Sequence, residues 1–208
     1  EEAGDEWIKV KYNGNEGYIK TAYITSNTVT PLIVEKNRVA SLKANLTIES
    51  DLSKPSGLTL SDYKTVLTNN VSDKNKIFEN NAEVFYNAEQ KYKINGIFLA
   101  SVGIHESAWG TSSLAQNKFN LFGFAADDRD PYNSAKTFES YEDAINTVAE
   151  ALSTKYLHVA GTNISDGIVA TGSYFNGTNV KSVNVRYASD EAWGEKVFSY
   201  MQYLYQKL

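Results

Sequence analysis

The sequence is 208 residues long, has 42% hydrophobic and 22% charged residues, and carries a formal net charge of −5. These values are typical of a globular protein with a buried core, and the length fits one medium-sized domain with an appendage. The acidic balance and the lack of a basic patch argue against a nucleic-acid partner, and no apolar run approaches the roughly 18 residues of a membrane helix. Cysteine is absent, which excludes disulfides, thiolate metal sites and cysteine nucleophiles.

The first 26 residues have the pattern of β-strands. Residues 7–12 alternate between polar and apolar side chains, Asn13-Gly14 is a hairpin turn signal, and residues 17–19 resume the alternation. The next stretch, residues 27–45, begins with a polar composition that includes Pro31 and is predicted to be a linker. We therefore expect a short N-terminal β appendage (1–26), a linker (27–45) and a main domain (46–208).

Helical patterns dominate the main domain. Residues 94–109 are apolar nearly all round and predict a central, buried helix. Residues 124–138 are too rich in turn residues for a helix and predict a short β-hairpin or flap, while residues 158–187 predict a long loop over one side of a cleft. Amphipathic helices are expected on either side of these segments, with N-caps at Thr59, Ser72, Ser140 and Ser189.

Glu106 is the most informative residue of the central helix. It continues the apolar stripe of Phe98 and Val102 and falls in the last turn, where the helix dipole disfavours negative charge. Burial and the dipole would both favour the protonated carboxyl, which is the form a general acid needs. Small residues and the Asn120–Gly123 turn follow, so we expect an acid at the mouth of a polar cleft, as acid-catalysed glycoside cleavage requires.

Neighbouring aromatic and histidine side chains have simpler interpretations. Trp109 and Trp193 are expected in the core first and as sugar platforms second. His105 points about 100° round the helix from Glu106 and is expected to pack rather than to catalyse. With only one other histidine, His158, and no cysteine, the chain has no zinc ligand set, and we expect neither a metal nor a cofactor.

Three strings carry a family resemblance: GIHESAWGTSSLAQNKFNLFGF (103–124), FESYEDAI (138–145) and VRYASDEAWGEKV (185–197). Together they resemble the catalytic domain of glycoside hydrolase family 73, above all its clostridial cell-wall autolysins, over residues 46–208. The resemblance implies a mainly α, lysozyme-like fold with a small β-hairpin lobe beside a groove. Residues 7–24, WIKVKYNGNEGYIKTAYI, resemble the last strands of a bacterial Src-homology-3-like wall-binding module.

The resemblance also implies roles for individual residues. Glu106 falls on the family's general acid and Tyr187 on its cleft tyrosine. The second carboxylate is expected in the β-lobe, with Asp128 as first choice. Further candidates for that carboxylate are Asp127, Asp130 and Glu139. The substrate-binding residues expected are Asn120, Phe122 and Phe124 on the groove floor, and Tyr174 in the long loop over the cleft.

The activity implied is hydrolysis of the β-1,4 bond between N-acetylglucosamine and N-acetylmuramic acid in peptidoglycan, by a monomeric protein secreted to the bacterial cell wall. The second carboxylate could act in an inverting or a retaining mechanism, or the substrate's N-acetyl group could be the internal nucleophile. Two other functions are compatible with the sequence. One is a muramidase or lytic transglycosylase on the same scaffold, and the other is a non-catalytic wall-binding lectin.

Overall fold

A computed structural model of the chain describes residues 7–12, 15–20, 31–125 and 130–208, and divides it into two compact units, residues 1–42 and 43–208. The first unit contains an antiparallel hairpin of β1 (Trp7–Tyr12) and β2 (Asn15–Lys20), in which Trp7 lies opposite Lys20. The predicted β appendage is therefore confirmed as a hairpin. Its turn, residues 13–14, lies outside the described residues, and its relation to a Src-homology-3-like module stays a prediction.

A helix, α1 (Pro31–Asn45), occupies most of the segment for which the sequence predicted a linker. Arg38 donates hydrogen bonds to Glu35 one turn earlier, from Nε at 3.0 Å and Nη2 at 2.5 Å. Such pairs stabilise an exposed helix by only a few tenths of a kcal/mol. The boundary between the two units falls within this helix, after Leu42.

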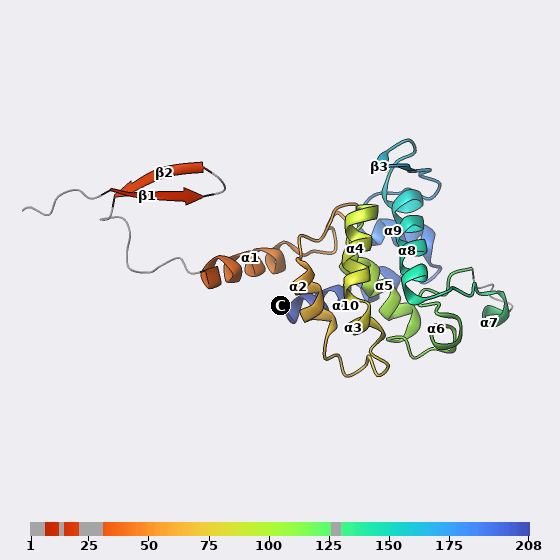
Figure 1. Cartoon of the computed structure of the whole chain (residues 1–208). Coiled ribbons are helices and arrows are strands. Elements are labelled where there is room, and N and C mark those ends of the chain that lie inside the picture. Colours follow the sequence, from red (N-terminus) through yellow and green to blue (C-terminus); the bar gives the residue numbers. More distant parts are fainter. Residues whose placement is uncertain (1–6, 13–14, 21–30, 126–129) are drawn as a thin grey trace, which may run out of the picture. The chain divides into compact units, whose positions relative to one another are not determined.

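The second unit is built from helices around α5 (Gly96–Ser107), whose side chains are nearly all buried (Figure 1). The longest helix of this unit, α10 (Trp193–Gln206), packs along α5, while α4 (Ala82–Tyr92) packs against α5 and α8. The predicted central helix and the mainly α fold are confirmed. The remaining helices are α2 (Leu60–Leu67), α3 (Ile77–Asn80), α6 (Ser113–Lys118), α7 (Pro131–Ser134), α8 (Tyr141–Ala151) and α9 (Val180–Tyr187).

Two of the predicted N-caps are present. Thr59 and Asp62 form a reciprocal capping box, in which the Thr59 N–H donates to Asp62 Oδ2 at 2.7 Å and the Asp62 N–H to Thr59 Oγ1 at 3.2 Å. At the start of α8, Ser140 Oγ accepts the N–H of Asp143 at 3.1 Å. These contacts satisfy helix N–H groups that would otherwise lack a partner.

The other two predicted caps are wrong. Asp73 rather than Ser72 serves the start of α3, because its carboxylate accepts the N–H groups of residues 77, 78 and 79 at 2.8–3.0 Å. The segment that follows forms two helices, α3 and α4, which are separated at Asn81, whose side-chain amide donates to the carbonyl of Ile77 at 2.8 Å. Likewise, α10 begins at Trp193, four residues after Ser189.

The predicted long loop, residues 158–187, has more structure than expected. It contains α9 and a small antiparallel hairpin of β3 (Asn163–Ser165) and β4 (Ile168–Val169). The hairpin expected over residues 124–138 is replaced in its described part by the short helix α7, and residues 126–129 lie outside the description. The small β-lobe therefore lies beside α8 and α9 (Figure 1), later in the chain than the sequence predicted.

A buried carboxylate anchors the first turn of α5. Glu89 is fully buried and accepts hydrogen bonds from the N–H groups of Ser56 and Gly96 and from the Tyr63 hydroxyl, at 2.7–2.8 Å. Gly96 is needed here, because a Cβ atom at this position would collide with the Tyr63 hydroxyl. The start of the central helix is thus fixed to α2 and α4.

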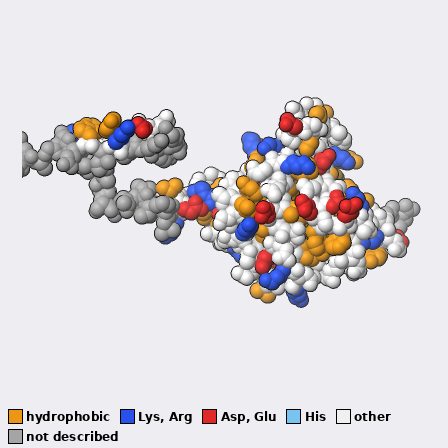
Figure 2. Space-filling view, viewed as in Figure 1, with side chains coloured by type: hydrophobic (Ala, Val, Ile, Leu, Met, Phe, Trp, Pro, Cys, Tyr) orange, Lys and Arg blue, Asp and Glu red, His pale blue; other side chains and the backbone are white. Residues whose placement is uncertain are grey.

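Among the described residues, every helix is too short or too polar to cross a bilayer. On the face of the second unit seen in Figure 2, acidic, basic and hydrophobic side chains are interspersed. No large area of one charge sign is visible on that face.

Candidate active site

An open groove of about 710 Å³ lies beside the C-terminal end of α5. It is formed by the end of this helix, the turn after Asn120, the π-helical turn η2 (Leu152–Leu157) and the segment between α9 and α10. Its volume is within the ~300–1,000 Å³ typical of ligand sites. The residues that line it are His105, Glu106, Phe122, Gly123, Ala125, Tyr156, Tyr187, Ala188, Ser189, Asp190 and Trp193.

Glu106 lies in the last turn of α5 and faces the groove. Directly after it the chain leaves the helix through three residues with positive φ, Ala108, Trp109 and Gly110. The expectation that Glu106 is buried is wrong: the residue is exposed. The apolar stripe ends one turn earlier because the helix emerges from the core at the groove, whereas the predicted position in the last turn is confirmed.

Trp193 makes the closest contact with the acid. Its indole Nε1–H donates to Oε1 of Glu106 at 2.8 Å. The expected burial of Trp193 is confirmed, since it is only 2% exposed, but the sequence reading missed its bond to Glu106. The only indication of such a bond in the sequence is that a buried tryptophan usually finds an acceptor for its indole N–H.

A series of aromatic rings continues from Trp193 along the groove. The rings of Trp193 and Tyr187 are 4.7 Å apart, those of Tyr187 and Tyr156 5.7 Å, and those of Tyr156 and Tyr174 5.0 Å. Burial raises the pKa of Tyr187 far above its usual range, and the charge of Glu106 and the neighbouring Tyr156 raise it further. Tyr187 is therefore a neutral phenol that can donate a hydrogen bond in the groove.

Tyr174 and Phe124, both predicted to bind substrate, lie away from Glu106. They line a smaller cavity of about 190 Å³ that shares Tyr156 and Tyr187 with the groove. The N–H of Tyr174 donates to the carbonyl of Lys155 at 2.9 Å, which ties the loop around it to η2. The two residues therefore lie where the aromatic series leads out of the groove.

Asn120 was expected to bind substrate on the groove floor, but its side chain is used within the protein. This residue is buried, and its amide is fully engaged: Oδ1 accepts the N–H groups of Phe122 and Phe124, and Nδ2 donates to the carbonyls of Phe124 and Lys136, all at 2.9–3.2 Å. Such an amide has no remaining capacity to bind a sugar. Asn120 instead shapes the turn that presents Phe122, and Phe122 itself lines the groove.

Four residues were predicted as candidates for the second carboxylate. Asp128, the first choice, and Asp127 lie outside the described residues. Asp130 is exposed, and its carboxylate accepts hydrogen bonds from Asn133, whose side chain lowers the pKa of Asp130. Glu139 is also exposed, and neither Asp130 nor Glu139 lines the groove.

One groove carboxylate was not among the predicted site residues. Asp190 lines the groove, accepts the N–H of Ala192 at 3.0 Å and pairs with Lys196 Nζ at 2.6 Å. The bond from Lys196, followed by that from Ala192, lowers the pKa of Asp190. It therefore contributes a fixed negative charge to the groove wall.

The other residues considered from sequence have structural contacts. His105 is partly buried at the groove edge with its ring 6.2 Å from that of Tyr200, and Trp109 packs edge-on against Phe78. His158 Nδ1 lies 3.0 Å from the carbonyl of Ser153. Within the described ranges, no three His, Asp or Glu side chains gather in a way that could hold a metal ion.

Comparison with known proteins identifies a family. Residues 82–206 match the glucosaminidase family, described as mannosyl-glycoprotein endo-beta-N-acetylglucosaminidase. Two proteins of Streptococcus pneumoniae, from strains TIGR4 and R6, are 37% identical over 134 residues, or 64% of this chain, and carry the name endo-beta-N-acetylglucosaminidase as a provisional assignment. The chain spans less than a fifth of their length, 18% and 17% respectively.

Solved structures share the fold. A catalytic mutant of Staphylococcus aureus Autolysin E in complex with the disaccharide NAG-NAM has a TM-score of 0.53 at 22% identity, covering 82% of this chain and 78% of that one. Glucosaminidase B of S. aureus has a TM-score of 0.52 at 18% identity, covering 96% of this chain and 78% of that one. At these identities the likeness establishes the lysozyme-like autolysin fold.

Proposed function

The chain belongs to the glucosaminidase family of glycoside hydrolases, and on this premise we propose that it hydrolyses the β-1,4 bond between N-acetylglucosamine and N-acetylmuramic acid in peptidoglycan, with Glu106 as general acid. The observation that carries this proposal is the exposed carboxyl of Glu106 at the end of a buried helix, facing an open groove with tyrosine and tryptophan walls. The partly exposed rings of Tyr156 and Tyr187 can stack on sugar rings, and their hydroxyls can bond sugar hydroxyls.

The substrate class is supported by the solved relatives. Autolysin E has been crystallised with the disaccharide NAG-NAM and with the muropeptide NAM-L-Ala-D-iGlu. We propose that this chain takes the same class of glycan in the groove beside Glu106. A cell-wall substrate places the protein outside the cytoplasm, as a secreted wall autolysin, and no oligomer is required for the proposed reaction.

The proposed chemistry starts with the proton of Glu106. It passes to the glycosidic oxygen, the bond from that oxygen to C1 of N-acetylglucosamine breaks, and the electron pair leaves with the oxygen. Glu106 lies in the last turn of α5 and lines the groove, so its carboxyl can reach a glycosidic oxygen bound there. A bound sugar would displace water from the groove around Glu106.

The oxygen of a water molecule then forms the new bond to C1, and a base takes up the proton from that water. We propose that Asp128 is this base or, in a retaining route, a nucleophile whose carboxylate first bonds C1 and is then displaced by the water, which gives its proton to the Glu106 carboxylate. The N-acetyl group of the substrate is the alternative nucleophile. The neutral Tyr187 hydroxyl is placed to orient whichever group acts, since Tyr187 lines the same groove as Glu106. Glycan without N-acetyl groups separates these routes: it is cleaved if Asp128 acts, and resists cleavage if the N-acetyl group does.

The test is Glu106→Gln, measured as release of soluble fragments from purified peptidoglycan. We expect the rate to fall by about 10²–10⁴-fold, the usual worth of general acid catalysis. The matched control is Glu142→Gln, an exposed residue in the first turn of α8, which should retain the wild-type rate. A Glu106→Gln protein with near wild-type activity would remove Glu106 from the mechanism, and a wild-type protein that binds wall without cleaving it would support the lectin alternative.

A further inference from the structure

We infer that Trp193 is a positioning residue for Glu106: its indole fixes one carboxyl oxygen and leaves the other, Oε2, to carry the catalytic proton. The inference rests on the proposed role of Glu106 as general acid. Beyond that role, it assigns the catalytic proton to Oε2 and names the residues, Trp193 and Asn184, that hold the carboxyl in place.

The assignment follows from the chemistry of the indole ring. The Nε1–H of tryptophan can only donate a hydrogen bond. Oε1 of Glu106, at 2.8 Å from Nε1, must therefore be an acceptor whether the carboxyl is protonated or ionised. A proton on Oε1 pointing along this bond would meet the indole hydrogen, so the acidic O–H forms on Oε2.

The tryptophan is itself held rigidly. It is 2% exposed, and its ring packs 4.7 Å from that of Tyr187, on the wall of the groove. It is also the first residue of α10, a 14-residue helix that packs along α5 and fixes the backbone of Trp193. Trp193 therefore has little freedom to follow Glu106, and Glu106 must adopt the rotamer that meets the indole.

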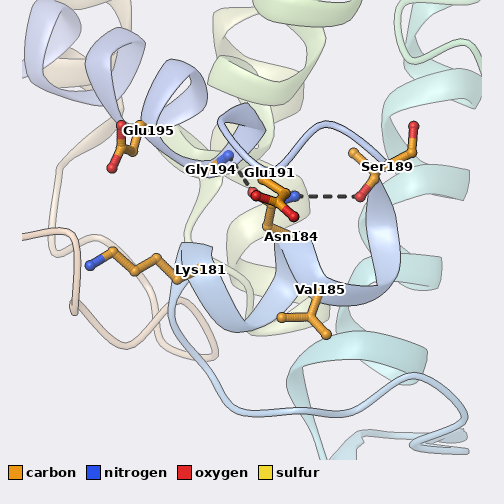
Figure 3. A pocket seen from close by; sticks show the side chains of 8 residues that line it. Lys181, Asn184, Val185, Ser189, Glu191, Gly194 and Glu195 are labelled. Atoms are coloured by element: carbon orange, nitrogen blue, oxygen red, sulfur yellow. Dashed lines mark hydrogen bonds between the residues drawn. The ribbon is translucent and has the colours of Figure 1, made fainter.

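Asn184 connects the segment before Trp193 to α9. Its Oδ1 accepts the N–H of Gly194 at 2.8 Å, and its Nδ2 donates to the carbonyl of Asp190 at 2.9 Å and to that of Ala188 at 3.5 Å. Figure 3 shows this amide between Gly194 and the end of α9, in a neighbouring cavity of about 590 Å³. One buried side chain thus fixes the backbone on both sides of Trp193.

The arrangement has a direct consequence for the reaction. When Oε2 gives its proton to the glycosidic oxygen, the carboxylate left on Glu106 keeps its bond from the indole N–H, and a bond to a charged acceptor is stronger than one to a neutral acceptor. Trp193 thus stabilises the product state of the proton transfer without moving. Removing its N–H should favour the protonated carboxyl up to a higher pH.

Several other ionisable side chains near Glu106 must be distinguished from it. His105 lies on α5, Tyr156 on η2, Tyr187 on α9, and Asp190 in the segment between α9 and α10, where it pairs with Lys196 of α10. Histidine is the residue type among them that ordinarily changes charge near neutral pH. His105→Gln is therefore needed as a background for any pH measurement on this groove.

The first experiment does not depend on activity. The chain has 3 tryptophans, so a ¹H–¹⁵N spectrum contains three indole signals, and Trp193→Phe identifies the one from Trp193. In the His105→Gln background we expect this signal to move with pH as Glu106 ionises, and to stop moving in His105→Gln/Glu106→Gln. A Trp193 signal that is unaffected by Glu106→Gln would overturn the inference, even if the enzyme cleaves peptidoglycan as proposed.

The second experiment measures the pH dependence of kcat/KM for Trp193→Phe. We expect a loss of about 10- to 100-fold at the optimum, the worth of a hydrogen bond to a charged group, and an alkaline limb displaced to higher pH. Asn184→Ala should reproduce both effects more weakly, and Trp109→Phe, a buried tryptophan outside the groove, should not displace the limb. If Trp193→Phe lowers only the thermal stability and leaves the limb in place, the role of Trp193 is structural and the inference fails.

Discussion

Glu89 offers a test of how the catalytic helix is held at the end opposite Glu106. Its buried carboxylate accepts hydrogen bonds from Ser56 N–H at 2.8 Å, Tyr63 hydroxyl at 2.7 Å and Gly96 N–H at 2.7 Å, all to Oε2, and from Ser56 Oγ to Oε1 at 3.1 Å. Glu89→Ala leaves these donors without an acceptor, and the donors of Tyr63 and Gly96 are buried. Each unsatisfied donor costs about 1–3 kcal/mol.

Removal of the carboxylate also relieves the cost of burying a charge, which offsets part of this loss. We therefore expect Glu89→Ala to lower the free energy of unfolding by about 3–5 kcal/mol, the cost of the unsatisfied donors less this relief. For a protein of this size about 1 kcal/mol corresponds to 2–4 °C in Tm, so Tm should fall by about 6–20 °C. Glu89→Gln keeps one acceptor oxygen and should cost about 1–2 kcal/mol.

These differences in the free energy of unfolding are measured by urea unfolding, followed by the helical circular dichroism signal. Glu83→Ala on the same helix is the control, since Glu83 is exposed, pairs with Lys64 at 3.4 Å, and should cost under about 1 kcal/mol. A Glu89→Ala protein within about 1 kcal/mol of the wild type would refute the assigned role of the network.

The same residue gives a pH dependence with a defined sign. Burial, opposed by the hydrogen bonds from Tyr63, Gly96 and Ser56, raises the pKa of Glu89 above its ordinary value of 4.5. The folded state then binds the proton more tightly than the unfolded state, so this contribution to stability is full below about pH 4.5 and is lost as pH rises through the folded-state pKa. Glu89→Gln should abolish this part of the pH dependence.

Three further predictions concern other residues. Asp128→Asn should lower the rate of peptidoglycan cleavage by about 10²-fold or more if the carboxylate acts as base or nucleophile, and a near wild-type rate would exclude Asp128 and leave the role to Asp127 or to the substrate's N-acetyl group. Tyr187→Phe should lower kcat by about 10- to 100-fold with little change in Tm, since its ring contacts persist, and an unchanged kcat would exclude the hydroxyl from the reaction. Partial burial acts to raise the pKa of Asp51, but bonds from Ser53 and Lys54 outweigh it and lower this pKa to about 2. Above pH 3.8 the wild type should therefore be more stable than Asp51→Asn, by under about 1 kcal/mol because the group is partly exposed. In urea titrations this difference should vanish as the pH falls towards 2.

Features set by neighbouring residues could be predicted from the sequence. The capping box of Thr59 and Asp62 and the cap at Ser140 depend on side chains that reach backbone groups three residues away. The central helix was predictable because a segment that is apolar on all sides can only be buried. The position of Glu106 in its last turn followed from the same pattern.

Features set by distant contacts could not be predicted in this way. The bond between Trp193 and Glu106 joins residues 87 positions apart, and no periodicity reports it. The exposure of Glu106 depends on where α5 leaves the core, which is decided by the helices packed around it. The sequence predicts a linker where α1 lies because this helix has no pronounced apolar face, and the π-helical turn η2 has no distinct sequence signal.

The most direct test of the proposed function is the chemistry of the new chain ends. Purified peptidoglycan is digested with the wild-type protein and with Glu106→Gln, the products are reduced with borohydride, and their masses are determined. The proposal predicts reduced N-acetylglucosamine ends in the wild-type digest and almost none in the Glu106→Gln digest. Reduced N-acetylmuramic acid ends would instead identify a muramidase, anhydro-muramyl ends would identify a lytic transglycosylase, and either result would contradict the proposed bond specificity.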